Sequence, residues 1–199
     1  SEYAEGIVVY GKLDIYGDSD KDTLDISGYY GIQVMSYGLV ELCSNAALEL
    51  GGGIINIDGA YVGISVSEDS YSGNAFVEFG DCELTINAED TAISIASENM
   101  ASVYFDNTKL EINAGSIGID VESKLSSIDI KGSDVKIDSY FVGILAVSMD
   151  TMLSLEIMPA SVYVCDSRVE ISVAYYSADE GFATIIGTLN LDPEIKIVR

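Results

Sequence analysis

A pattern of alternating apolar and polar residues recurs along most of the chain. In five segments an apolar-x-apolar unit is followed, seven residues after its start, by a second such unit. These segments are Leu48–Ile57, Val77–Ile86, Val103–Ile112, Ile128–Ile137 and Val162–Ile171. Alternation with a period of two is typical of a short strand that buries one face. Each segment therefore predicts two short strands joined by a turn.

A third strand precedes each pair. It begins with Gly-apolar-x-apolar, or once with Ala-Ile-Ser-Ile, and the starts lie about 25 to 38 residues apart. The starting residues are Gly6, Gly31, Gly63, Ala92, Gly118, Gly143 and, in a weaker last copy, Gly181. Three short strands cannot bury their inner faces alone, but stacked copies form three parallel sheets around a continuous core. The sequence predicts one all-β domain over residues 1–199, a right-handed parallel β-helix of about seven coils.

The turn between the last two strands of each coil supports this prediction. Its second residue is Gly52, Asp81, Asn107, Gly132 and Asp166 in the five copies. These are the residue types that tolerate a left-handed backbone. Its third residue is always small, namely Gly53, Cys82, Thr108, Ser133 and Ser167. A tight, stacked corner explains both preferences, whereas a β-sandwich, the rival fold, does not.

The composition predicts a sharp division between an apolar interior and an acidic surface. Apolar residues make up 48 % of the chain, and the mean hydropathy is +0.28. The chain nevertheless contains 33 acidic and only 9 basic residues, so its formal charge is −24. The carboxylates must therefore cover the surface. This charge argues against nucleic acids and anionic membranes, which need basic residues, and favours cations, basic partners or simple solubility. No apolar run is long enough to span a membrane.

Residue types also restrict the chemistry. The chain has no histidine, which removes Ser-His-Asp and Cys-His catalysis and most zinc, copper or iron sites. Three cysteines, Cys43, Cys82 and Cys165, form neither a disulfide framework nor a zinc motif, and small buried thiols are expected instead. The sequence predicts a protein that is not an enzyme and has no organic cofactor.

The repeat resembles the parallel β-helix repeats of the pectin-lyase-like superfamily, and the resemblance extends from Gly6 to Ile197. It implies architecture rather than activity, because that superfamily contains lyases, glycoside hydrolases, tailspikes, adhesins and non-catalytic carbohydrate-binding modules of bacterial surface proteins. The chain is short and poor in loops compared with the enzymes, so it is more similar to the non-catalytic modules. The resemblance implies an extracellular or cell-surface protein.

Outward residues of stacked strands form columns, and one column is acidic. Glu68, Asp69, Glu98, Asp120 and Glu122 fall on three adjacent coils, with Lys124 beside them. A carboxylate pair for glycosidic hydrolysis and a calcium-assisted lyase site are the catalytic interpretations. A solvated acidic face is the alternative. We retain Glu98, Asp120 and Glu122 as candidate calcium ligands.

A second candidate calcium site lies in the loop that begins at Gly17. Asp18, Asp20 and Asp22 alternate as in the start of an EF-hand loop, but Thr23 stands at the sixth position and Tyr29 at the twelfth. The EF-hand match therefore fails. A weaker calcium site and a plain acidic turn both remain open.

Aromatic residues supply the candidate ligand contacts, because sugar rings stack on exposed aromatic faces. Tyr29, Tyr61 and Phe141 stand two residues before the glycine of a coil start, with Tyr30 and Tyr140 beside them, although Asp90 and Ser116 interrupt the column. In the middle strand of each coil, Tyr104 and Tyr163 share a column with Glu49, Glu78 and Asp129. The candidate ligand-binding residues are Tyr29, Tyr30, Tyr61, Tyr104, Phe141 and Tyr163. Packing at the corner is the alternative role for the first column.

Further aromatic residues cluster at Tyr175 and Tyr176, and the stretch from Met149 to Ser161 is the main departure from regularity. Irregular loops on a rigid scaffold often carry binding function. Three functions follow from these patterns. The first is a non-catalytic module that binds polysaccharide, with or without calcium. The second is a structural or adhesive spacer that contacts other proteins. The third, least supported, is a lyase or hydrolase of the same fold, for which basic residues are scarce.

Overall fold

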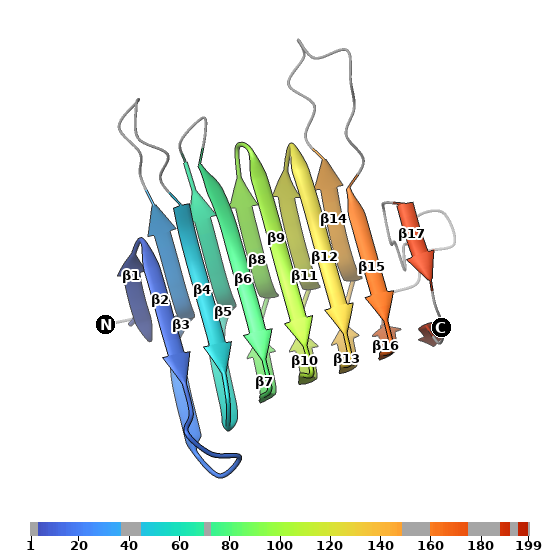
Figure 1. The fold of residues 1–199 in the computed structure, drawn as a ribbon. Helices are drawn as coiled ribbons and strands as arrows, with labels where there is room; N and C mark the ends of the chain where they lie inside the picture. The colour runs from blue at the N-terminus through green and yellow to red at the C-terminus, as the bar shows by residue number, and fades with distance from the viewer. Residues whose placement is uncertain are drawn as a thin grey trace.

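The computed structural model describes residues 4–36, 45–69, 73–148, 160–174, 188–191 and 195–198. These residues form parallel strands wound into a β-solenoid (Figure 1). The predicted class, an all-β parallel β-helix, is confirmed. The predictions that concern Cys43, residues 149–159, Tyr175, Tyr176 and Gly181 lie outside the described residues.

Three faces make up each coil, and we name them by their place in Figure 1. The front face is a seven-stranded sheet. Its strands are β2 (Lys12–Tyr16), β4 (Asn45–Gly51), β6 (Asn74–Gly80), β9 (Met100–Asp106), β12 (Leu125–Lys131), β15 (Ser161–Cys165) and β17 (Thr188–Leu191).

The lower and rear faces belong to one continuous sheet, because β3 (Thr23–Ser36) and β5 (Ile54–Glu68) run through the corner between them. The lower face takes their first halves and then β7 (Glu83–Ala88), β10 (Lys109–Ala114), β13 (Asp134–Ser139), β16 (Arg168–Val173) and β18 (Ile195–Val198). The rear face takes β1 (Ile7–Tyr10), their second halves, β8 (Thr91–Ser97), β11 (Ile117–Ser123) and β14 (Val142–Ser148).

The sequence predicted two separate strands where β3 and β5 are each continuous. Glycine explains the difference at this corner, since a Cβ atom on Gly59 would lie 2.1 Å from the carbonyl oxygen of Val62. The backbone can therefore bend sharply here without leaving the extended conformation. In later coils short turns break the strand at the same place.

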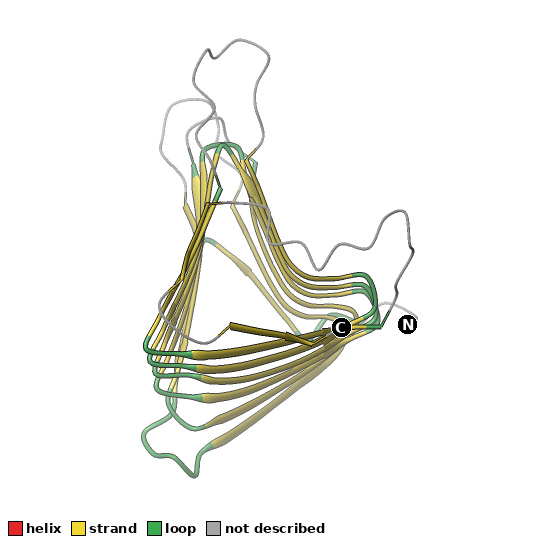
Figure 2. Cartoon of the chain, turned by 90° about the vertical axis from the view of Figure 1, so that its right-hand side faces the viewer, coloured by secondary structure: helices red, strands yellow, loops and turns green. Residues whose placement is uncertain are grey.

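The solenoid is right-handed. In Figure 1 the front strands run downward and the rear strands run upward while the chain advances from left to right. Viewed along its axis in Figure 2, the cross-section is roughly triangular, and the rear face is bent so that its outer surface is concave.

Inward side chains stack in the predicted columns. On the front face one such column contains Leu50, Phe79, Phe105, Ile130 and Val164, all at most 3 % exposed. The rings of Phe79 and Phe105 stack with their centroids 5.0 Å apart. Because most inward apolar residues have apolar residues above and below them, the core is one continuous apolar column along the axis.

The corner between the front and lower faces has the predicted left-handed backbone. The φ angles are +51° at Asp81, +50° at Asn107 and +48° at Asp166, and Gly52 and Gly132 are also positive. The third turn residue is buried in each copy. There the amide of Thr108 donates to the Ser133 hydroxyl at 3.0 Å, and the amide of Ser133 donates to the Ser167 hydroxyl at 3.0 Å. Small residues are required because this hydroxyl ladder joins one coil to the next.

The glycines at the coil starts have a packing role. A Cβ atom on Gly63 would lie 2.3 Å from the Cγ2 atom of Ile86, which projects inward from the lower face. The two faces approach closely at this narrow corner, so the position favours glycine, and the alanine at position 92 is the largest residue found there. Of the cysteines, Cys82 is buried as predicted, whereas Cys165 is half-buried. The described residues form no apolar helix of membrane-spanning length.

Candidate functional site

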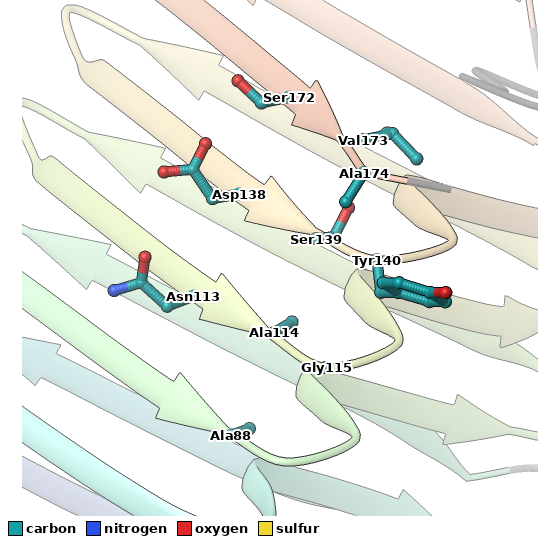
Figure 3. Close-up of a pocket in the computed structure, with 10 residues that line it drawn as sticks. All are labelled: Ala88, Asn113, Ala114, Gly115, Asp138, Ser139, Tyr140, Ser172, Val173 and Ala174. Atoms are coloured by element: carbon teal, nitrogen blue, oxygen red, sulfur yellow. The ribbon is translucent and has the colours of Figure 1, made fainter. Parts of the chain in front are cut away.

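A groove of about 540 Å³ lies at the corner between the lower and rear faces, where β7, β10, β13 and β16 end (Figure 3). Three features line it: an outer row of polar side chains, an inner row of small side chains, and the turns that lead to the rear face. The strands fix the rows, because residues in register on parallel neighbours stand one interstrand spacing apart.

Asn113, Asp138 and Ser172 form the polar row. The Asn113 amide donates to the Asn87 side-chain oxygen at 2.9 Å, and the Asn87 amide donates to Asp58 at 2.7 Å. This ladder fixes the orientation of Asn113. Lys136 holds the Asp138 carboxylate at 2.9 Å. The row therefore offers an amide, a carboxylate and a hydroxyl in defined positions.

The inner row is made of small side chains. Ala88, Ala114, Ser139 and Val173 are in register, and Gly115 follows in the turn. The Ser139 side chain is only 5 % exposed, and its hydroxyl has no hydrogen-bond partner among the described residues. Buried hydroxyls usually have a partner, so Ser139 is an exception, and its burial keeps this hydroxyl from the surface of the groove.

Tyr140 provides the aromatic side of the groove. Its side chain is 44 % exposed, and its ring meets the ring of Phe141 edge-on, with centroids 4.7 Å apart and planes at 89°. Phe141 thus supports Tyr140, and it is Tyr140, not Phe141, that lines the groove (Figure 3). The sequence pattern predicted Phe141 as the ligand contact and placed Tyr140 only beside it.

The other aromatic residues of this column gather at the same corner nearer the N-terminus. Tyr29 stacks on Tyr61 with centroids 5.2 Å apart and planes at 12°, and Tyr30 meets both rings edge-on. Asp90, in the next coil, raises the pKa of Tyr61 through its charge and a hydrogen bond. The predicted juxtaposition of these three tyrosines is confirmed, but their rings largely contact one another.

Tyr104 and Tyr163 lie on the front face, away from both corner clusters. They flank Asp129 on the neighbouring strands, in the register that the sequence predicted. Their exposed fractions are 41 % and 46 %. The six candidate ligand residues therefore do not form one site.

On the rear face Asp120 and Glu122 point outward from β11, as predicted. Glu98 is exposed in the turn after β8, but Glu68 is only 2 % exposed because it occupies an inward position. Glu68 thus does not join the outward acidic cluster proposed from the sequence. Burial, and secondarily the charge of Glu122, raises the pKa of Asp120 from 3.8 to about 7.

The acidic loop is organised by its own hydrogen bonds. The Asp22 carboxylate accepts the backbone amides of Asp18 at 2.8 Å and Ser19 at 2.9 Å, which closes the turn. Asp20 is exposed. Within the described ranges, no three acidic or cysteine side chains come together as a metal-binding group, either here or around Asp120. Calcium binding stays a prediction at both places.

A charge ladder runs across the lower face. Lys136 stands between Glu111 and Glu170 in register and lies 3.3 Å from Glu111, whereas Glu170 is bound by Arg168 at 3.0 Å. These pairs are exposed, so each contributes little to stability.

No protein-family model, curated protein or solved structure matches this chain.

Proposed function

We propose that this protein is a non-catalytic β-helix module that binds polysaccharide in the groove beside Tyr140. One observation supports this most strongly: the groove combines an exposed aromatic ring, a row of oriented polar groups and a floor of small side chains. Sugars present apolar ring faces and hydroxyl edges, so they need such a combination.

The geometry suits a chain running across several coils. Asn113, Asp138 and Ser172 come from three successive strands, about 4.8 Å apart. An extended glycan lying along this row would meet a new polar group at each strand while one ring packs against Tyr140.

The carboxylate content of the groove favours binding without catalysis. Glycoside hydrolysis ordinarily requires two carboxyl groups on opposite sides of the scissile bond. Among the described residues that line the groove, Asp138 is the only acidic one, and it forms an ion pair with Lys136. We therefore infer retention of a glycan without release of products. A pectin-lyase-like ancestry and an extracellular or cell-surface location accord with this function and form part of the proposal.

The test is affinity electrophoresis through gels that contain soluble neutral polysaccharides. We expect Tyr140→Ala to weaken the retention of the best ligand by roughly tenfold, because an aromatic anchor at the centre of a site contributes more than 1 kcal/mol. Tyr10→Ala is the matched control, since Tyr10 is 70 % exposed on β1. It should migrate like the parent protein.

A reducing-sugar assay on the same polysaccharides completes the experiment. Retention without reducing ends supports a binding module. Equal retention of the two variants would refute the groove as the site. If no polysaccharide slows the parent protein, the proposal fails and a spacer that contacts other proteins becomes the better account.

A further inference from the structure

We propose that the front face carries a second binding site, in which Tyr104, Asp129 and Tyr163 hold an arginine side chain of a basic partner protein. This site is separate from the groove and does not depend on glycan binding. It uses two of the predicted ligand tyrosines that do not line the groove.

Strand register defines the geometry. Asp129 on β12 is directly opposite Tyr104 on β9 and Tyr163 on β15. All three side chains point outward, and the two tyrosines are therefore about two interstrand spacings, roughly 10 Å, apart. Between them a flat group would lie about 5 Å from each ring, with the Asp129 carboxylate beneath it. This is within the range of cation–π attraction.

The charges favour a cation from outside. On the same face Lys12 binds Asp14 at 3.3 Å and Glu49 at 2.6 Å. On the lower face Lys109 binds Glu83, and Lys136 binds Glu111 and Asp138. Asp129 makes no ion pair with any described residue, and burial raises its pKa. A carboxylate that is partly shielded from water and lacks a cation gains most from one that arrives with a ligand.

Other charges near the site do not replace this cation. Glu78 is the next residue of the column beyond Tyr104 and adds negative potential. Lys131 lies two residues further along β12, where it is in register with Asp106. No ion pair between Lys131 and Asp129 is present in the described part of the chain. The formal charge of −24 attracts basic proteins over longer distances.

Arginine fits this arrangement better than other cations. Its guanidinium is planar, so it can stack on aromatic rings and donate two parallel hydrogen bonds to one carboxylate. A lysine ammonium is a compact, strongly hydrated charge and makes neither contact as well. A calcium ion requires six or more oxygen ligands, and one carboxylate does not supply them.

Calorimetric titration with triarginine and trilysine peptides tests the proposal, because the two carry equal charge. At fixed ionic strength we expect the parent protein to bind triarginine about tenfold more tightly. Asp129→Asn and the double substitution Tyr104→Ala/Tyr163→Ala should each abolish this preference. The double substitution Tyr104→Phe/Tyr163→Phe should retain it, since phenyl rings preserve the stacking.

Asp134→Asn is the matched control. It removes the same charge at an exposed position of the lower face and should leave the preference intact. Equal affinity of the parent protein for the two peptides would overturn the proposal, as would a preference that survives Asp129→Asn. A neutral oligosaccharide that competes with triarginine for the parent but not for the Tyr→Ala pair would assign this face to glycans instead.

Discussion

Phe79→Ala is expected to lower the free energy of unfolding by about 3–5 kcal/mol, the range for a buried phenylalanine. The Phe79 ring is completely buried and stacks on Phe105 in the next coil. In a stacked core the space left by the ring lies between two coils, and neither can close it without breaking its register with the other. Denaturant unfolding measures the loss.

Glu78→Ala is the control for this substitution, because Glu78 is adjacent in sequence but points outward. This substitution should change the free energy of unfolding by no more than about 0.5 kcal/mol. A loss below 1 kcal/mol for Phe79→Ala would contradict the inward orientation of Phe79, and with it the register of the front face.

Asp120→Asn is expected to stabilise the protein above neutral pH and to have little effect near pH 3. The folded-state pKa of Asp120 is raised from 3.8 to about 7. Folding therefore favours the protonated acid, and its stabilising contribution is complete below pH 3.8 and is lost as the pH rises to about 7. One pKa unit corresponds to about 1.4 kcal/mol, so this loss is at most about 4 kcal/mol, and partial exposure reduces it to about 2–3 kcal/mol.

Asparagine cannot ionise. The difference in the free energy of unfolding between the variant and the parent protein should therefore develop between pH 4 and 7. Chemical unfolding at pH 3 and pH 8 measures it. Glu98→Gln removes an exposed carboxyl group near the rear face. Its effect on the free energy of unfolding should show no comparable pH dependence. A difference of equal size at both pH values would show that the asparagine acts through packing rather than charge.

The fold could be predicted from the sequence because the coil repeats its local requirements. Asp81, Asn107 and Asp166 occupy equivalent left-handed positions, and the strict period of two fixes which side chains point inward. Once the copies are aligned, the alignment gives the register, so columns such as Tyr104–Asp129–Tyr163 follow directly. The continuous strands at Gly28 and Gly59 were missed because a glycine bend inside a strand resembles a turn in sequence.

The groove could not be predicted in the same way. It depends on how far the turns after Ala88, Ala114 and Ser139 lie from the lower face. The alternation of apolar and polar residues does not determine this distance. Glu68 was misplaced for a related reason. The residue occupies an inward position that serines fill in neighbouring coils, at Ser36 and Ser97, and a charged residue there is an exception to the pattern.

Backbone and side-chain chemical-shift mapping with the neutral oligosaccharide of highest affinity tests the central claim most directly. We predict that the shifted signals cluster at Asn113, Asp138, Ser139 and Tyr140, and that those of Tyr104 and Tyr163 stay unchanged. Shifts confined to another face, or none with any oligosaccharide, would contradict a glycan-binding groove at this corner.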